Sequence, residues 1–338
     1  MTCGSLCGRR AVLAGLAAFG ASAAAFPVLG KTAAGKAAAQ VIDIHYHVAP
    51  PAWVDALTAR HLMEPQWNGW SVAKAVEDMD RDGIARAIIS VPGVYFGDAA
   101  EARKLARACN DFSAKLRADY PGRFGIFASV PLPDIDGTLA EIAYALDEIK
   151  ADGIGLLTSY GDKWLGDPSF TPVMDELNRR KTILYTHPTT ANCCHNLIPG
   201  LRDQMIEYGT DTTRAIAQLV FTGEAQRHPD LRIIFSHAGG TMPSLYYRFV
   251  TRAAEGRNAA PGALDELRRF YYDTAQTAVA PAMAALRHVA PVSHILFGSD
   301  YPYRGDGDTE RGLRRSGIFS AAEIAAIEHG NARALLRA

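Results

Sequence analysis

The stretch that decides the fold is Val41-Ile-Asp-Ile-His-Tyr-His47, a short apolar run that ends in two histidines. Seven further short runs rich in β-branched or apolar residues follow it along the chain. They are residues 85–91, 124–130, 153–158, 182–187, 232–237, 270–273 and 294–299. Segments of helical periodicity separate them, which is typical of repeated βα units around a parallel sheet. Eight units over roughly 300 residues predict an α/β fold of the closed (β/α)8 type, the TIM barrel.

The segments between the runs support this prediction. Three of them have the spacing of amphipathic helices, namely residues 101–118, 138–150 and 213–227. An open doubly wound sheet is the alternative, but it normally carries a glycine-rich phosphate loop after its first strand, and none follows His47. Residues 48–71 are rich in proline and tryptophan without clear periodicity, so we expect an inserted loop over the catalytic face. Near the C-terminus, Ser320 and Glu323 form a capping box ahead of a closing helix.

The composition suits one large globular domain, with 48% hydrophobic and 21% charged residues. Lysine and arginine number 35 against 36 aspartates and glutamates, so no net charge attracts nucleic acid or an anionic membrane. A small molecule is therefore the expected binding partner.

The first 36 residues differ in kind from the remainder. Arg9 and Arg10 precede an uncharged run rich in alanine and glycine, residues 11–30, which is the layout of a twin-arginine export signal. These residues are only weakly apolar, which favours a cleavable signal over a stable membrane anchor. We expect residues 1–36 to be signal peptide and linker, residues 37–338 to be the barrel, and the protein to be periplasmic. A cytoplasmic location is the alternative if the signal interpretation is wrong.

The cysteines predict no disulfide framework. Cys3 and Cys7 lie in the predicted signal, which leaves Cys109, Cys193 and Cys194 without a CxxC spacing. We expect the adjacent pair to be ordinary loop or core thiols. We expect no catalytic cysteine, because nothing nearby in the sequence marks an activated thiolate.

Five residues suited to metal binding or proton transfer stand where predicted strands end, namely His45, His47, His187, His237 and Asp300. His45 and His47 are two residues apart, so the period of a strand points both imidazoles to one side. Two convergent neutral imidazoles are half of a zinc site. Barrel enzymes assemble their sites at the C-terminal ends of the strands, so the set predicts a metal centre there. Taken singly, His187 or His237 would fit a hydrogen-bonded core histidine better than a site residue, and Asp300 could also cap the following helix.

The motifs around these residues closely resemble those of the amidohydrolase-related family, which includes aminocarboxymuconate semialdehyde, 6-methylsalicylate and resorcylate decarboxylases together with related hydrolases. The resemblance covers about residues 41–338. In order, it rests on Asp43-Ile-His45-Tyr-His47, Leu156-Leu-Thr-Ser159, Asp167-Pro-Ser-Phe170, Thr186-His187-Pro188, Ser236-His237-Ala-Gly239-Gly240, Tyr272-Asp273-Thr274 and Phe297-Gly-Ser-Asp300-Tyr-Pro302.

The resemblance implies a ligand set and a proton-transfer residue. Its metal ligands are His45, His47, His187 and Asp300, and His237 activates water or handles the proton. Binuclear amidohydrolases usually carry a carboxylated lysine at the end of strand four, where this sequence has Leu-Leu-Thr-Ser. A single divalent metal per subunit follows, with zinc as the first expectation and manganese, iron or cobalt as alternatives.

The resemblance leaves two reactions open and favours the first. A metal-dependent decarboxylase would act on a small aromatic or unsaturated carboxylate, with His237 or Asp300 supplying a proton to the carbon that loses CO2. A metal-dependent hydrolase of a lactone, ester or C–C bond is the alternative, with the same residues taking a proton from water. Export keeps hydrolysis open, because it would be unusual for a catabolic decarboxylase. A binding barrel without catalysis is a third class, against which the intact ligand set argues.

Arg248 is the expected substrate-binding residue. It matches a position that, in the decarboxylase relatives, reaches a neighbouring subunit's site and holds the substrate carboxylate, a task suited to a bidentate guanidinium. The resemblance therefore implies a homodimer, and an exposed arginine without this role is the alternative. Asp273 is expected to orient a metal ligand.

Overall fold

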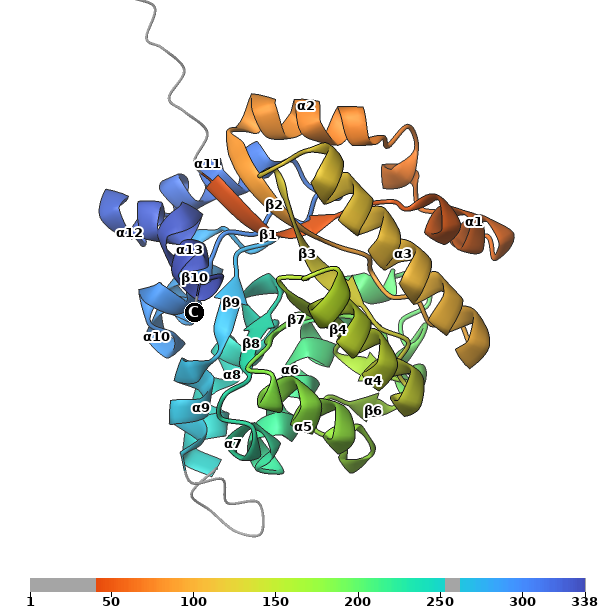
Figure 1. The fold of residues 1–338 in the computed structure, drawn as a ribbon. Coiled ribbons are helices and arrows are strands. Elements are labelled where there is room, and N and C mark those ends of the chain that lie inside the picture. Colours follow the sequence, from red (N-terminus) through yellow and green to blue (C-terminus); the bar gives the residue numbers. More distant parts are fainter. Residues whose placement is uncertain (1–40, 253–261, 338) are drawn as a thin grey trace, which may run out of the picture. The chain divides into compact units, whose positions relative to one another are not determined.

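The computed structural model describes residues 41–252 and 262–337, so the predicted signal at residues 1–36 lies outside the described part. Eight parallel strands form a nearly closed barrel surrounded by helices (Figure 1). In barrel order they are β1 Val41–His47, β2 Ile84–Ser90, β3 Phe124–Ser129, β4 Gly153–Leu157, β7 Ile183–His187, β8 Arg232–Phe235, β9 Tyr271–Asp273 and β10 Ile295–Leu296. The predicted (β/α)8 fold is confirmed, and every strand starts within one residue of its predicted run, although β8 ends two residues and β10 three residues earlier than predicted.

The barrel closes where β1 meets the segment that follows β10. The N–H of Asp300 donates to the carbonyl oxygen of His45 at 2.9 Å, and the N–H of His47 donates to that of Tyr301, also at 2.9 Å. These main-chain bonds join the first barrel strand to the chain after the last one. The closing seam therefore holds three of the predicted metal ligands.

Helices cover the outside of the barrel (Figure 1). They are α2 Val72–Asp82, α3 Ala99–Asp119, α4 Ile135–Ala143, α5 Thr171–Arg179, α6 Glu207–Phe221, α7 Glu224–Arg227, α8 Met242–Arg252, α9 Ala263–Arg269, α10 Ala280–Val289, α11 Asp306–Ser316, α12 Ala321–Ala325 and α13 Asn331–Leu335. Local chemistry sets their ends. The Ser71 hydroxyl accepts the N–H of Lys74 at the start of α2, and Gly83 ends that helix in the left-handed region. The predicted capping box of Ser320 and Glu323 is present at the start of α12.

The insertion after β1 is more regular than the sequence predicted. Residues 48–71 contain helix α1, Pro51–Ala59, and a 3-10 turn, η1, at Pro65–Trp67. Trp53 and Leu57 lie one turn apart on α1 and pack against α3 in a separate apolar cluster. Only these two α1 residues are buried, which is too few to produce a clear helical period. The insertion is thus packed against α3 at the C-terminal end of the barrel.

Apolar side chains from six strands fill the barrel interior. They are Ile42, Ile44, Ile88, Phe127, Ile183, Tyr185, Ile234 and Leu296, and α13 adds Ala332 and Leu335 to the same cluster. The ring of Tyr185 meets the ring of His45 edge-on, with 5.4 Å between the centroids. The ring of His45, a predicted metal ligand, therefore packs against the side chains that fill the barrel interior.

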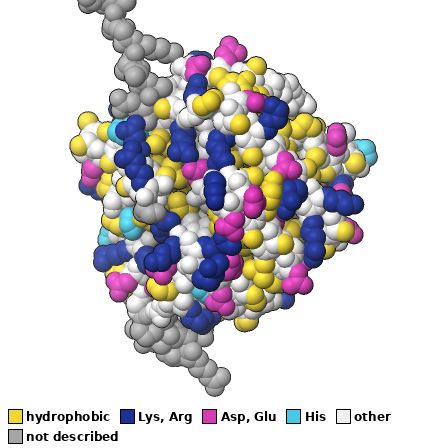
Figure 2. Space-filling model, in the orientation of Figure 1, with side chains coloured by type: hydrophobic (Ala, Val, Ile, Leu, Met, Phe, Trp, Pro, Cys, Tyr) yellow, Lys and Arg dark blue, Asp and Glu magenta, His cyan; other side chains and the backbone are white. Residues whose placement is uncertain are grey.

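Charge on the outside is mixed. Basic and acidic side chains are interspersed over the face shown in Figure 2, in keeping with their nearly equal numbers. Within the described ranges, no helix has the length and apolar character needed to cross a membrane.

Candidate metal centre and active site

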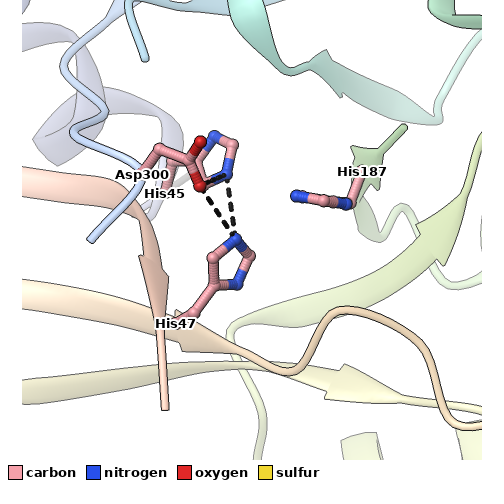
Figure 3. Close-up of side chains that lie close together, drawn as sticks. All are labelled: His45, His47, His187 and Asp300. Atoms are coloured by element: carbon pink, nitrogen blue, oxygen red, sulfur yellow. Dashed lines mark hydrogen bonds and ion pairs between the residues drawn. The ribbon is translucent and has the colours of Figure 1, made fainter. Parts of the chain in front are cut away.

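Four side chains converge at the C-terminal end of the barrel. The Nε2 atoms of His45 and His47 lie 3.1 Å apart, and Asp300 Oδ1 lies 3.1 Å from the first and 3.2 Å from the second. His187 points toward them from the other side (Figure 3). One ligand atom from each residue lies within 4.8 Å of all the others. The structure therefore brings together the whole predicted ligand set.

The Nδ1 atom of each of the three histidines, which faces away from the cluster, has a hydrogen-bond partner. His45 Nδ1 lies 2.8 Å from Asp273 Oδ2, and His187 Nδ1 lies 2.9 Å from the carbonyl oxygen of the next residue. A carboxylate and a carbonyl only accept, so both Nδ1 atoms carry the hydrogen. His47 Nδ1 lies 3.1 Å from the Ser90 hydroxyl. Such contacts leave the Nε2 lone pairs aimed into the cluster, as metal ligation requires.

Burial and charge set the protonation of the cluster. Burial holds the pKa of His187 well below its ordinary value and also lowers the pKa of His47, so both rings are neutral. Burial lowers the pKa of His45 as well, but the charges of Asp273 and Asp300 outweigh it and raise this pKa to about 10. The two buried carboxylates thus require a positive charge between them, which an imidazolium or a bound divalent cation supplies.

The donor atoms fit a metal ion. Asp300 Oδ1 is buried and has no hydrogen-bond partner within the described chain, although the Nε2 atoms of His45 and His47 lie 3.1 and 3.2 Å away. Metal–nitrogen bonds of about 2.0–2.1 Å place neighbouring tetrahedral ligands about 3.3 Å apart, close to these separations. Three imidazole nitrogens and one carboxylate oxygen are donors that divalent transition metals accept. The residues therefore fit one divalent metal.

Two residues of the site adopt unusual backbone conformations. Asp300 has φ 68° and His237 has φ 52°, both in the left-handed region that residues other than glycine seldom occupy. The turn after His237 continues in this region to Gly240, where a Cβ would overlap the carbonyl oxygen of Gly209. The Ser-His-Ala-Gly-Gly motif thus encodes the turn that carries His237 out of the strand.

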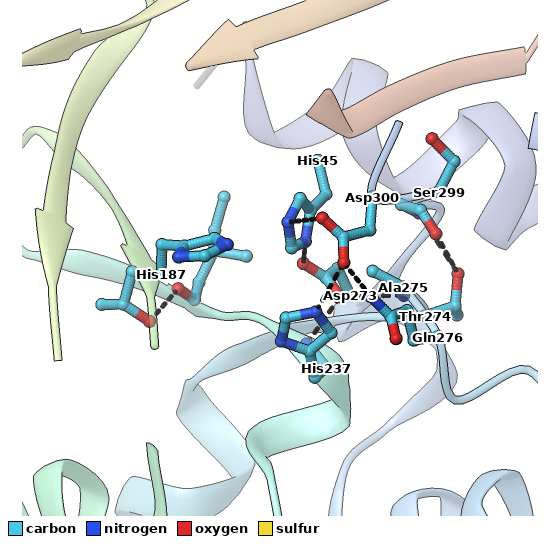
Figure 4. Close-up of polar contacts among 12 residues, drawn as sticks. His45, His187, His237, Asp273, Thr274, Ala275, Gln276, Ser299 and Asp300 are labelled. Carbon is cyan, nitrogen blue, oxygen red and sulfur yellow. Dashed lines mark hydrogen bonds and ion pairs between the residues drawn. The ribbon is translucent and has the colours of Figure 1, made fainter. Parts of the chain in front are cut away.

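His237 lies beside the metal cluster (Figure 4). Its Nε2 is 3.2 Å from Asp300 Oδ2, while the other oxygen of that carboxylate faces His45. The backbone N–H of His237 donates to Asp273 Oδ1 at 2.8 Å, so Asp273 forms hydrogen bonds with both His45 and His237. The side-chain amide of Gln276 also donates to Asp300 Oδ2. The predicted proton-transfer residue is therefore in contact with a predicted ligand, and the orienting role expected of Asp273 matches its contacts.

The cluster opens into a cavity of about 430 Å³, a size that suits a small organic ligand. Its lining residues are Glu64, Gln66, Pro92, His187, Arg202, Gln204, Met205, Tyr208, Gly209, His237, Gln276, Thr277, Asp300, Tyr303 and Arg304. Arg202 Nη2 and Gln204 Nε2 donate to Glu64 Oε1 at 2.8 and 3.0 Å, so the insertion after β1 meets the β7–α6 connection. Sequence reasoning missed these loop residues, because a lining built from loops has no periodic signal.

The end of β4 carries hydroxyl groups where binuclear amidohydrolases have the lysine. The hydroxyls of Thr158 and Ser159 donate to the buried carboxylate of Asp211 on α6, as does the indole N–H of Trp164. Asp211 therefore fastens the β4 end to a helix. It was not predicted, because its three partners lie about 50 residues away in the sequence.

Arg248 is the predicted site residue that lies away from the cluster. It is exposed on α8 and is absent from the cavity lining of its own protomer. Its role in a neighbouring subunit's site stays a prediction. His195, in the loop after β7, pairs with Asp203 at 3.1 Å and does not line the cavity either.

The expectation that Cys193 and Cys194 are free thiols is wrong. The two sulfurs form a disulfide at the 3-10 turn Asn192–Cys194, in the connection after β7. Adjacent cysteines close a small ring within one turn, so the spacing rules for disulfide frameworks do not detect them. Cys109 is a buried free thiol, and burial raises its pKa to about 12.

Histidines from the first and fifth barrel strands and an aspartate after the eighth define a metal-dependent barrel enzyme. Residues 42–338 match the family model described as Amidohydrolase, and the chain belongs to this family. It is 38% identical over 279 residues to a 6-methylsalicylic acid decarboxylase of Aspergillus aculeatus, covering 77% of this chain and 84% of the relative. It is 36% identical over 277 residues to the corresponding enzyme of Penicillium expansum, with the same coverage.

Solved structures agree with the fold. The crystal structure of an amidohydrolase II protein matches with a TM-score of 0.83 and 26% identity, covering 88% of this chain and all of that one. A dihydroxybenzoic acid decarboxylase from Polaromonas, solved with bound manganese and the inhibitor 2-nitroresorcinol, matches with a TM-score of 0.75 and 21% identity. That match covers 88% of this chain and 97% of the other.

Proposed function

We propose that this enzyme is a metal-dependent decarboxylase of a small aromatic carboxylate related to 6-methylsalicylate. The observation that carries the proposal is one cavity lined by His237 and by two of the predicted ligands, His187 and Asp300, in a chain 38% identical to a 6-methylsalicylic acid decarboxylase. The hydrolase alternative uses the same residues, and the similarity to these carboxy-lyases argues against it.

Decarboxylation breaks the bond between the ring and its carboxylate. The electron pair stays with the ring carbon, which takes up a proton as CO2 leaves. A divalent metal, when bound, supplies positive charge that stabilises the negative charge developing on the substrate. His237 delivers the proton from the cavity wall. Asp300 Oδ2, 3.2 Å from His237 Nε2, orients that ring, while Asp273 holds the backbone of His237.

The identity of the metal is part of this proposal. Zinc is the first candidate because three imidazoles and a carboxylate suit its tetrahedral sites. Manganese is the alternative, since the Polaromonas decarboxylase binds it. Elemental analysis of the purified protein, followed by reloading with each metal, distinguishes them.

A parallel screen tests the reaction. Metal-loaded protein is incubated with hydroxybenzoates, including 6-methylsalicylate, and with small lactones, while CO2 release and acid release are followed. We expect at least one hydroxybenzoate to yield CO2 and the matching phenol in equal amounts. The His187→Ala variant is the control for contaminating activity. Acid release from lactones without CO2 from any carboxylate would make the enzyme a hydrolase.

We also propose a homodimer in which Arg248 reaches the neighbouring subunit's cavity. In its support, Leu245 and Tyr247 beside it on α8 are 36% and 75% exposed, and such apolar side chains favour burial by a partner. Light scattering of the purified protein measures the assembly. A monomer with full activity would contradict this proposal.

Export by the twin-arginine route is a further proposal, based on Arg9 and Arg10 ahead of their apolar run. Replacing both arginines by lysine should leave uncleaved precursor in the cytoplasm, measured by cell fractionation and mass spectrometry. Unchanged periplasmic recovery of the twin-lysine variant would count against export by this route.

A further inference from the structure

Outside the metal cluster, the described side chains that line the cavity include one more arginine than carboxylate. Its lining includes two arginines, Arg202 and Arg304, and one carboxylate that is not a predicted ligand, Glu64. Arg202 donates to Glu64 at 2.8 Å, so these two charges neutralise each other. Arg304 is exposed and lines the same cavity, and no carboxylate of the described side chains forms an ion pair with it.

The backbone that carries Arg304 is anchored to the metal cluster. The N–H groups of Tyr303 and Arg304 both donate to the carbonyl oxygen of Asp300, at 2.8 and 3.2 Å. The indole N–H of Trp67 donates to the Tyr303 hydroxyl at 3.2 Å. The turn is therefore held by a predicted ligand on one side and by the insertion after β1 on the other. Because this backbone is already anchored, binding a ligand through the Arg304 guanidinium does not require the turn to become ordered.

We propose that Arg304, in addition to the Arg248 proposed to reach the cavity from a neighbouring subunit, binds the substrate's negative charge and favours aromatic carboxylates over neutral ring compounds. A guanidinium pairs with a carboxylate through two parallel hydrogen bonds, which a neutral amide or phenol cannot match. The substrate class in this inference rests on the proposed decarboxylase function. Because loss of CO2 removes the negative charge, Arg304 also favours substrate over product, and its removal should increase product inhibition relative to substrate binding.

The test compares two ligands of nearly the same shape, 2-methylbenzoate and 2-methylbenzamide. Neither has the ring hydroxyl that activates an aromatic acid for protonation, so both stay intact during a titration. Calorimetry with metal-loaded enzyme gives their dissociation constants in the wild type and in Arg304→Gln and Arg304→Lys. The matched control is Arg315→Gln, an exposed arginine on α11 that does not line the cavity.

We expect Arg304→Gln to raise the dissociation constant of 2-methylbenzoate by about 10- to 100-fold, the range for the loss of hydrogen bonds to a charged group. The dissociation constant of 2-methylbenzamide should change less than about twofold, and Arg304→Lys should fall between the wild type and Arg304→Gln. Arg315→Gln should match the wild type with both ligands. Metal content is measured in every variant, and the lysine variant carries the comparison if the glutamine variant loses metal.

Equal losses for the two ligands, or no loss for either, would overturn the role of Arg304. If the charge-selective loss is observed while no hydroxybenzoate releases CO2 in the wild type, the anion site stands and the decarboxylase proposal fails. If CO2 is released and anion binding is unchanged in Arg304→Gln, the enzyme is a decarboxylase and this inference fails.

Discussion

The metal cluster and the mouth of the cavity belong to one site but are built differently. His45 and His47 are fully buried at the end of a barrel strand, and each is held through its second nitrogen. The mouth is formed by the insertion after β1 and by the β7–α6 connection. Glu64 of the first pairs with Arg202 of the second, and Met205 of the second is 72% exposed. The difference indicates that the rigid strand ends carry the chemistry, while the insertions carry recognition.

The largest effect should follow a change inside the cluster. His45→Ala or His187→Ala should abolish activity and deplete the bound metal, because each removes one of the four predicted metal donors. Elemental analysis and circular dichroism measure metal content and folding, and we expect the barrel to stay folded. Full metal occupancy in both variants would reject the ligand assignment and, with it, the contrast between the two regions.

The next effect concerns His237, which touches the cluster without joining it. His237→Asn should keep near-normal metal content and lose roughly 10²-fold or more in kcat, the usual scale for removing a general acid or base. Steady-state kinetics and elemental analysis on the same preparation check this. Metal loss like that of His187→Ala would make His237 a ligand. Near-normal turnover would leave Asp300 as the better candidate for proton transfer.

A smaller effect on metal binding is expected from a change in Asp273, which contacts the cluster without being a predicted ligand. Asp273→Asn weakens the acceptor for His45 Nδ1 and for the backbone of His237, so metal affinity should fall about 10- to 100-fold. Competition with a chelator measures that affinity. The hydrogen bonds to the histidine Nδ1 atoms are the main feature that distinguishes the cluster from the mouth. An unchanged metal affinity would show that metal binding does not depend on them.

The smallest effect belongs to the mouth. Glu64→Gln removes the charge opposite Arg202, whose side chain is 63% exposed, and such ion pairs contribute little. We expect KM to change by at most about fivefold, with kcat and metal content unaffected. Initial-rate measurements over a range of substrate concentrations check this. A large fall in kcat would contradict the division between chemistry and recognition.

Much of the fold was predictable because strands of a parallel barrel are buried on both faces and appear as continuous apolar runs. The ligands were predictable for a related reason, since residues at strand ends share one face of the barrel. Helix α1 was not, because only Trp53 and Leu57 of its nine residues are buried. The two-residue strands β5, Ser159–Tyr160, and β6, Lys163–Trp164, are too short to show any alternation.

The mouth of the cavity shows where the sequence stops being informative. Glu64 and Arg202 are 138 residues apart, and neither belongs to a periodic segment. Their pairing depends on how two insertions fold over the barrel, which no local pattern encodes. Arg304 had a nearby signal, since it lies four residues after Asp300, but a lone loop arginine is more often solvated.

The closing seam has a consequence for biosynthesis. His45 lies near the start of the barrel and Asp300 near its end, about 255 residues later, yet the metal site needs both. At 5 to 20 residues per second, synthesis of that interval takes roughly 10 to 50 s, during which the growing chain has no complete site. A metal that needs both residues would therefore be acquired only late in making the protein. A bound ion would then tie the first strand to the last and make the finished barrel harder to open.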